Sequence, residues 1–470
     1  MPFVVEILDN MGRQHPLPAG KSGVYAMFTF DSLQFIIPPM EKQLERKFEP
    51  APAYAQNLDK NDELAAFRER FYQIEGYIYM DGNSLGLCST DAETAVLDML
   101  RAWKENGIFL WNINDGRYFR YTRILAELAA PLLGVSPEEI CFASNTTINI
   151  HKAISTFYKP TPGRYKILVD DLNFPSDIYA VHSQVLLKGY EVNQAVKVVT
   201  SKDGRLIDED DLIEAMTEDV ALVLLSSVFY RSAQLLDINR LSAEARKRGI
   251  IIGWDLCHSI GAVPHDLTSA DPDFAVWCNY KYLSGGPGCP AGLYINRRNF
   301  EKMPGLWGWW GNNPQTQFQM SHNFEKASDA GAWQTGTPNL LALAPLEGVL
   351  RIYSEAGMKR IREKSLNLTA YLMFLIDEKL KKYGFSYANP REDSKRGGHV
   401  ALTHTDAYRI CMALKNRKVI PDFRDPDIIR LAPVALYNSY SEVYETVEIL
   451  EKIAISKEYE AFGTERGLVV

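Results

Sequence analysis

The sequence predicts an α/β protein with a mostly parallel central sheet that helices cover on both faces. Short apolar runs of strand length recur between residues 140 and 295, and helical patterns separate most of them. Strands that alternate with helices in this way indicate a parallel sheet packed between helical layers. A chain of 470 residues is long enough for a large core and a second domain.

The expected elements can be placed in order along the chain. A short strand at 77–80 leads into a loop punctuated by glycines. The strands of the sheet are predicted at 140–143, 166–169, 196–199, 220–226, 250–255, 274–278 and 292–295. Helices are predicted at 63–71, 91–105, 123–133, 340–354 and 406–418. Strand-like segments near His399 and Ile428 flank the last helix and complete a C-terminal α+β unit.

We expect four segments in the chain. Residues 1–57 form an N-terminal extension of unknown role, with strand-like residues at 23–38 and an alternative start at Met40. The other segments are an arm at 58–90 that contributes to the small domain and the active site, a large domain at 91–340 and a small α+β domain at 341–470.

Composition favours a cytoplasmic enzyme. The net charge of −8, without a basic tract, argues against nucleic acid or an anionic membrane as a partner. The longest apolar run, 220–228, is too short to span a bilayer, and the first ten residues do not resemble a secretory signal. The six cysteines contain no C-x-x-C pair and the eight histidines are dispersed, so we expect reduced thiols and no metal site.

Lys281 closes the aromatic run Trp277-Cys278-Asn279-Tyr280-Lys281-Tyr282-Leu283, and a glycine turn follows it. A lysine amine in such surroundings is expected to be desolvated, which disfavours the ammonium form and gives a nucleophile near neutral pH. Lysines of this kind hold aldehyde cofactors through a Schiff base. The alternative is a surface lysine whose stem covers a strand end.

An acid that suits such a cofactor ends the apolar run at 250–255. At the end of a buried parallel strand, Asp255 can pair with a protonated pyridine nitrogen and keep that ring an electron sink. His258 can orient this carboxylate or stack on the ring. Alternatively, Asp255 caps the following helix and His258 is a buried imidazole with satisfied hydrogen bonds. The presence of Lys281 at another strand end favours the cofactor site.

Two further segments fall at the same edge of the predicted sheet, where α/β proteins bind ligands. Thr146 and Thr147 begin a helical pattern and can donate to a phosphate, although double threonines are also common as plain helix caps. The run Phe174-Pro175-Ser176-Asp177 offers an aromatic plate and a carboxylate, or it is an ordinary loop.

These segments resemble those of the kynureninase family, pyridoxal phosphate enzymes of aminotransferase class V with the type I fold. The matching stretches occur in the family's order and spacing from about residue 58 to the C-terminus, and they are specific as a set. They are Gly82-Asn83-Ser84-Leu85-Gly86-Leu87, Phe174-Pro175-Ser176-Asp177, Asp255-Leu256-Cys257-His258, the run at 277–283, Gly308-Trp309-Trp310-Gly311 and Arg430-Leu431-Ala432-Pro433.

The resemblance implies a role for each matching residue. Lys281 is similar to the Schiff-base lysine that also acts as acid and base, and Asp255 to the partner of the pyridine nitrogen. The cofactor is further expected to contact Thr146, Thr147, Phe174, Pro175, Ser176, Asp177, Ser226, His258, Tyr280, Trp309 and Thr337. The substrate is expected to contact Ser84, Trp111, Gly336, Thr337 and Arg430. Tyr280 is a candidate proton relay or only a phosphate anchor, and Arg430 grips the α-carboxylate or forms a surface ion pair.

Two of these positions bear on substrate preference. Trp111 and Thr337, with Gly336, look like the bacterial enzymes that prefer unsubstituted kynurenine. Animal enzymes that favour 3-hydroxykynurenine have His and Asn at the positions of Trp111 and Thr337. An indole stacks on an aryl ketone but offers a ring hydroxyl no acceptor, whereas an imidazole does.

The resemblance therefore implies hydrolysis of L-kynurenine to anthranilate and L-alanine by a homodimer with pyridoxal 5′-phosphate, with 3-hydroxykynurenine as a possible second substrate. Another type I enzyme, an aminotransferase or a cysteine desulfurase, is an alternative. A desulfurase normally needs a mobile catalytic cysteine, and the C-terminal third has only Cys411, in helical surroundings. A non-catalytic binding module would predict damage to Lys281 or Asp255, and both are present.

Overall fold

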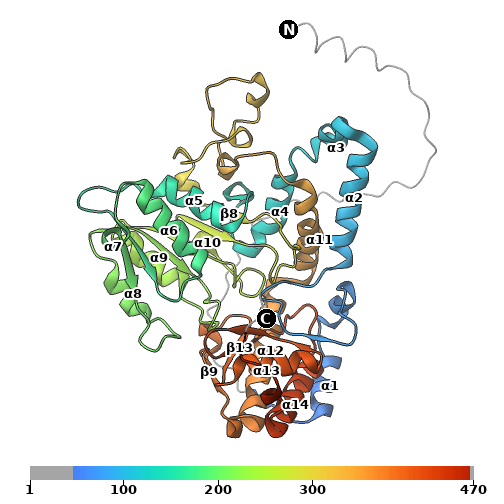
Figure 1. The fold of residues 1–470 in the computed structure, drawn as a ribbon. Helices are drawn as coiled ribbons and strands as arrows, with labels where there is room; N and C mark the ends of the chain where they lie inside the picture. The colour runs from blue at the N-terminus through green and yellow to red at the C-terminus, as the bar shows by residue number, and fades with distance from the viewer. Residues whose placement is uncertain (1–45, 466–470) are drawn as a thin grey trace, which may run out of the picture. The chain divides into compact units, whose positions relative to one another are not determined.

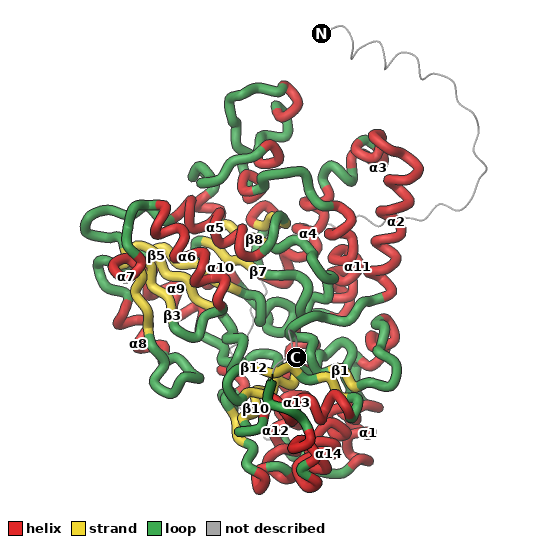
Figure 2. Tube along the Cα trace, viewed as in Figure 1, coloured by secondary structure: helices red, strands yellow, loops and turns green. Residues whose placement is uncertain are grey.

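The computed structural model describes residues 46–465, so the strand-like run at 23–38 and Met40 lie outside the described residues. The chain divides into the units Met1–Lys42 and Gln43–Val470, and the following description concerns the second unit. Within it, a larger α/β part is joined to a smaller α+β part (Figures 1 and 2).

The central sheet has seven strands among the described residues, in the order β2-β8-β7-β6-β5-β3-β4. The neighbours from β7 to β4 pair in parallel, and β8 is antiparallel to both of its neighbours. The strands are β2 (Ile140–Phe142), β3 (Lys166–Asp170), β4 (Val196–Val199), β5 (Val220–Ser226), β6 (Ile251–Asp255), β7 (Phe274–Trp277) and β8 (Gly292–Ile295). The expected mostly parallel sheet is confirmed, and the apolar runs located its strands closely.

Helices cover both faces of this sheet, which explains why its strands are continuous apolar runs. Leu222 and Leu224 of β5 belong to the core on one face, whereas Val223 and Leu225 belong to the core on the other. The first core includes residues of α5 (Thr146–Phe157) and α6 (Pro175–Leu187), and the second includes residues of α2 (Thr90–Asn106), α4 (Tyr121–Leu133), α8 (Glu209–Ala215), α9 (Ile238–Lys247) and α11 (Leu340–Ala356).

The smaller part is an antiparallel sheet covered by helices, with the strand order β12-β13-β10-β9. Its strands are β9 (Ser386–Tyr387), β10 (Val400–Thr403), β12 (Asp422–Arg424) and β13 (Ile428–Leu431), and its core also contains residues of α1 (Pro52–Lys60), α12 (Met358–Lys379), α13 (Ala407–Asn416) and α14 (Tyr440–Ser456). Ala55 of α1 is buried in this core, although it falls in the segment expected to be an extension. The limits of the domains stay a prediction.

The segment from 61 to 90 connects the two parts and runs beside the edge of the central sheet. β1 (Ile78–Tyr79) pairs in parallel with β11 (Val419–Ile420), and the N–H of Gly86 donates to the carbonyl of Tyr280 at 2.8 Å. The helical pattern at 63–71 forms a 3-10 helix at Ala65–Arg70 instead of an α-helix. None of the side chains within this 3-10 helix is buried, although Phe67 packs against the larger core and the flanking Leu64 and Phe71 are buried in it.

The remaining α-helices are short: α3 (Ile113–Gly116), α7 (Val192–Ala195) and α10 (Leu267–Ala270). None of the described helices has both the length and the apolar composition needed to cross a membrane. All six cysteines are free thiols.

Candidate active site

Most of the predicted site residues meet in one pocket at the carboxyl ends of the central strands. This cofactor-sized pocket has a volume of about 230 Å³. It is lined by the predicted residues Thr146, Thr147, Phe174, Ser176, Asp177, Ser226, Asp255, His258, Tyr280 and Lys281. They come from the N-terminus of α5, the start of α6 and the segments that end β5, β6 and β7, as the rule for ligand sites in parallel sheets predicts.

Lys281 follows β7 and faces this pocket. Its Nζ lies 2.9 Å from Nε2 of His258 and 5.8 Å from the centroid of the Phe174 ring. Burial acts to lower the pKa of Lys281, but the electrostatic influence of Cys278, Cys257 and Asp255 outweighs it, so the pKa is raised. The expected depressed pKa of Lys281 is therefore wrong.

His258 is the immediate partner of this ammonium. Burial, reinforced by the charge of Lys281, lowers the pKa of His258 well below its usual value. A neutral imidazole can accept a hydrogen bond through one ring nitrogen. His258 is therefore placed to accept a hydrogen bond from the Lys281 ammonium through Nε2, which lies 2.9 Å from Nζ.

Two carboxyl groups, Asp177 and Asp255, face the same pocket. Oδ1 of Asp255 accepts the N–H of Cys257 at 2.8 Å, whereas Oδ2 of Asp177 is buried without a hydrogen-bond partner among the described residues. Burial and the neighbouring charge of Asp255 raise the pKa of Asp177 well above its usual value. A pair of acids in one site favours a cationic group next to them.

The N-terminus of α5 opens into the pocket through Asn145, Thr146 and Thr147. Asn145 caps the helix, because its side chain accepts the N–H of Ile148 at 2.9 Å. The first N–H groups of an α-helix have no partner within the helix, and the first turn of α5 contains no acidic residue. This end of the pocket therefore suits an anion such as a phosphate.

Arg430 on β13 is only 1% exposed, so the alternative of a surface ion pair is wrong. Its Nη1 donates to the carbonyl of Tyr230 at 2.7 Å, and its Nη2 donates to Oγ of Ser84 at 3.0 Å. Tyr230 itself lines the cofactor-sized pocket. Two predicted substrate residues, Arg430 and Ser84, thus lie in contact with each other and next to the pocket wall.

Some lining residues were not predicted: Asn145, Val228, Tyr230, Cys257, Cys278, Cys289 and Ala291. The Tyr230 ring meets the Phe174 ring edge-on at 5.2 Å between centroids and lies 6.3 Å from His258. Tyr230 comes just after β5, so the strand-end rule applied to β5 could have found it. Cys257 and Cys278 were expected only as scattered thiols, yet they lie together: the N–H of Cys278 donates to Sγ of Cys257 at 3.1 Å.

Besides Ser84, Arg430 and Pro175, four predicted residues do not line this pocket: Trp111, Trp309, Gly336 and Thr337. Gly336 and Thr337 are exposed, and Trp309 is 43% exposed. Trp111 is half-buried, with its ring 6.0 Å from that of Trp310. Pro175 starts α6 between two lining residues. The roles assigned to these residues stay predictions.

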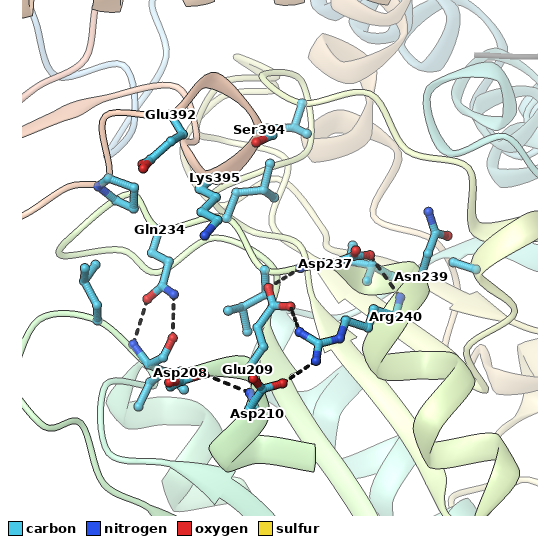
Figure 3. Close-up of a pocket in the computed structure, with 18 of the residues that line it drawn as sticks. Asp208, Glu209, Asp210, Gln234, Asp237, Asn239, Arg240, Glu392, Ser394 and Lys395 are labelled. Atoms are coloured by element: carbon cyan, nitrogen blue, oxygen red, sulfur yellow. Dashed lines mark hydrogen bonds and ion pairs between the residues drawn. The ribbon is translucent and has the colours of Figure 1, made fainter. Parts of the chain in front are cut away.

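A larger pocket of about 950 Å³ lies elsewhere, and its polar side chains mostly bind one another (Figure 3). Gln234 exchanges hydrogen bonds of 2.8 and 2.7 Å with the backbone of Ile207, and Arg240 pairs with Glu209 and Asp210. None of the predicted site residues lines it. Among the described residues, no cluster of three or more His, Cys, Asp or Glu side chains suits a metal ion.

Comparison with known proteins decides the family. Residues 361–450 match the model of the kynureninase C-terminal domain. The kynureninase of Bacillus thuringiensis subsp. konkukian (strain 97-27) is 53% identical over 422 residues, which are 90% of this chain and 99% of that protein. The chain belongs to the kynureninase family. A second kynureninase, from Geobacillus thermodenitrificans (strain NG80-2), is 52% identical over 421 residues, 90% of this chain and 98% of its own length.

Solved structures resemble the fold of this kynureninase-family chain. The cysteine desulfurase CsdA of Escherichia coli superposes with a TM-score of 0.70 over 84% of this chain and 99% of its own, at 19% identity. The cysteine desulfurase of Thermococcus onnurineus NA1 gives 0.71 over 83% and 98%, at 17% identity. At such identities the likeness concerns the fold alone, and it confirms the expected aminotransferase class V architecture of type I.

Proposed function

We propose that this member of the kynureninase family hydrolyses L-kynurenine to anthranilate and L-alanine, with pyridoxal 5′-phosphate as its cofactor. The observation that carries the proposal is the meeting of Lys281, Asp255, His258 and the N-terminus of α5 in one pocket. This pocket occurs in a chain that is 53% identical to a kynureninase over 99% of that protein's length.

The residues of the pocket fit pyridoxal phosphate at each of its groups. The open N-terminus of α5 suits the phosphate, and the amine of Lys281 suits the aldehyde. A protonated ring nitrogen would satisfy the pair of acids, one of which has a buried oxygen without a partner, Oδ2 of Asp177. When bound, the cofactor supplies an aldehyde that condenses with an amine and a ring that accepts an electron pair.

Lys281 and Tyr280 are the proposed catalytic residues. Lys281 removes the proton from Cα of the substrate through Nζ, and the neutral Nε2 of His258 at 2.9 Å holds that amine in place. Burial and the nearby Cys278 raise the pKa of Tyr280, so its phenol stays protonated and can donate to a reacting oxygen. A positioned acid of this kind contributes about two to four orders of magnitude to the rate.

The substrate is proposed to enter beside the Arg430–Ser84 pair, whose guanidinium suits an α-carboxylate. In the overall reaction, one water adds to the γ-carbonyl carbon and the Cβ–Cγ bond breaks. The aryl fragment leaves as a carboxylic acid, and Cβ receives a proton. The residues of the pocket need to supply only orientation and proton transfers for this chemistry.

The Lys281→Ala variant tests the proposal directly, with the exposed Lys302→Ala as the matched control. Purified Lys281→Ala protein should lose the yellow absorbance of the lysine-bound cofactor, and formation of fluorescent anthranilate from kynurenine should fall at least 1,000-fold, roughly the scale of losing one catalytic group. Lys302→Ala should match the wild type in both respects. Cleavage of kynurenine by Lys281→Ala at the wild-type rate would end the proposal.

A cysteine desulfurase activity has less support. Cys411, the candidate in the C-terminal third, is fully buried in α13. A catalytic cysteine that must reach the cofactor pocket has to be mobile, and the core of the smaller part holds Cys411 in place. Desulfurase activity would therefore need a different cysteine from the one that the sequence offered.

We infer that the active form is a homodimer. Large apolar side chains are exposed along α2 and just after it, with exposed fractions of 55% at Trp103, 74% at Ile108 and 69% at Phe109. A surface of this kind marks an interaction site. Trp309 and Thr337 lie outside their own chain's pocket, so a second copy that supplies them would complete it. A fully active monomer in light-scattering measurements would contradict this inference.

We further infer a preference for kynurenine over 3-hydroxykynurenine, because Trp111 has no acceptor for a ring hydroxyl. The half-buried Trp111 belongs to an aromatic cluster with Trp310, which lies 5.2 Å from Phe119. A cytoplasmic location likewise remains a proposal, in keeping with six free thiols.

A further inference from the structure

Lys152 on α5 is a buried lysine outside the residues assigned above. The residue is 1% exposed, and its Nζ donates to Oγ of Ser144 at 2.9 Å. Helical side chains lean toward the helix N-terminus, and this hydrogen bond reaches back past Asn145, the cap of α5. The ammonium group therefore lies at the N-terminal end of the helix that opens into the cofactor-sized pocket.

This position is unfavourable for a cation on three counts. The N-terminal end of a helix already carries partial positive charge. Burial lowers the pKa of Lys152, which records the cost of keeping the ammonium away from water. Among the described residues Lys152 forms no ion pair, Cys141 is the one titratable group that acts on its pKa, and the first turn of α5 has no acid.

The remaining neighbour does not supply the missing charge. Cys141 is the group that acts to raise the pKa of Lys152, but burial raises the pKa of the Cys141 thiol to about 12. The thiol is therefore neutral near pH 7. A purely structural tether to Ser144, whose φ is 56°, would need only a hydroxyl or amide donor and would not require a buried cation.

We propose that Lys152 is the buried counter-charge for the phosphate that binds at the N-terminus of α5. The proposal rests on the proposed function, because it takes the ligand of Thr146 and Thr147 to be the phosphate of pyridoxal phosphate. Lys152 does not line the pocket, so it acts as a positioning residue through its charge at the helix end. A phosphate at this helix end compensates the positive charge of the Lys152 ammonium and the partial positive charge of the helix N-terminus.

The test compares two ligands that differ only in the phosphate. Apoprotein of the full chain is titrated with pyridoxal phosphate and with pyridoxal, and each Kd is read from absorbance and from the rise in Tm on binding. For Lys152→Met, we expect the Kd of pyridoxal phosphate to rise about tenfold, or about 1.4 kcal/mol, and that of pyridoxal to stay within about twofold. The matched control is Lys159→Met. Lys159 is exposed, lies just beyond the C-terminal end of α5 and donates to the carbonyl of Ser155 within that helix.

Several outcomes separate the possibilities. An equal loss of affinity for both ligands in Lys152→Met, or no loss for either, would overturn the proposal while leaving the proposed function intact. Failure of the wild type to bind pyridoxal phosphate would defeat the proposed function itself. Ser144→Ala keeps the charge and removes the tether, so it should retain most of the affinity, and a full tenfold loss there would also overturn the proposal. If Lys152→Met does not fold, Lys152→Gln serves in the same comparison.

Discussion

The pair formed by Asp422 and Arg430 allows a prediction in which stability and catalysis change together. The two residues are opposite each other in the β12–β13 ladder, and they are 3% and 1% exposed. Oδ2 of Asp422 accepts from Nε of Arg430 at 2.5 Å and also contacts Nη2. Asp422→Asn would remove the anion and leave the buried guanidinium with Ser84 and the Tyr230 carbonyl as its partners.

The expected loss of stability follows from this burial. Removing one partner of a buried ion pair costs about 3 to 5 kcal/mol. Burial and the charge of Asp422 raise the pKa of the neighbouring Asp81 to about 6, so Asp422→Asn also relieves the repulsion between these two carboxylates. We therefore expect a loss near the lower limit, about 3 kcal/mol, in urea unfolding.

The same variant tests the assignment of Arg430 to the substrate carboxylate. Without the Asp422 carboxylate, the Arg430 guanidinium is held less firmly and binds the substrate carboxylate less well. KM for kynurenine should therefore rise at least tenfold, which corresponds to about 1.4 kcal/mol, while kcat changes less. Both constants are measured in an anthranilate fluorescence assay. The control is Asp406→Asn, which breaks a more exposed pair with Arg409 and should cost less than about 1 kcal/mol. An unchanged KM in a destabilised Asp422→Asn protein would refute the assignment of Arg430.

Three other substitutions address the site, the fold and the substrate preference. A Cβ at Gly86 would lie 2.1 Å from Ser284 Oγ and 2.4 Å from the Lys281 carbonyl oxygen, so Gly86→Ala would displace the backbone of Lys281 and should lower cofactor content and turnover. Gly163→Ala is the control, because its Cβ would have nothing within 4 Å, and it should change neither quantity. Burial raises the pKa of Asp170 to about 7 from 3.8, so its contribution to stability is intact below about pH 4 and is lost as pH rises to 7. Asp170→Asn should therefore gain stability over the wild type as pH rises, by at most about 4 kcal/mol at pH 8, and a gain that is equal at pH 5 and pH 8 would contradict this. Trp111→His with Thr337→Asn should shift kcat/KM toward 3-hydroxykynurenine, and an unchanged ratio would remove the specificity argument.

The sheet was predictable from the sequence because burial on both faces turns each strand into a continuous apolar run. The same burial made strand ends easy to locate, and Asp255 and Lys281 were found there. The start of α6 was missed, since 174–177 was also consistent with a loop, although a proline at the first helical position is itself a signal for a helix start. The 63–71 segment has the apolar spacing of a helix, and Leu64, Phe67 and Phe71 do lie in or against the larger core, but the segment forms a 3-10 helix at Ala65–Arg70.

Other parts of the site depend on contacts that no single segment reveals. Arg430 meets Ser84 across 346 positions of sequence, and Asp177 in the first turn of α6 meets Asp255 at the end of β6. Trp111, Trp309 and Thr337 could be assigned only by resemblance, because they do not line the pocket. A sequence pattern identifies which side chains lie at a sheet edge, and long-range packing determines which of them touch.

The pKa of Lys281 illustrates this limit in energetic terms. The local run of aromatic residues indicates burial, and burial alone lowers the pKa of a lysine. The opposing contributions come from Cys257 and Asp255 at the end of β6 and from Cys278 after β7, so the sign depends on which strands are neighbours. The same neighbours provide a neutral acceptor, His258, within 2.9 Å of Nζ. The strand neighbours of Lys281 thus stabilise its charged form, and the neutral His258 beside it accepts a hydrogen bond from the ammonium.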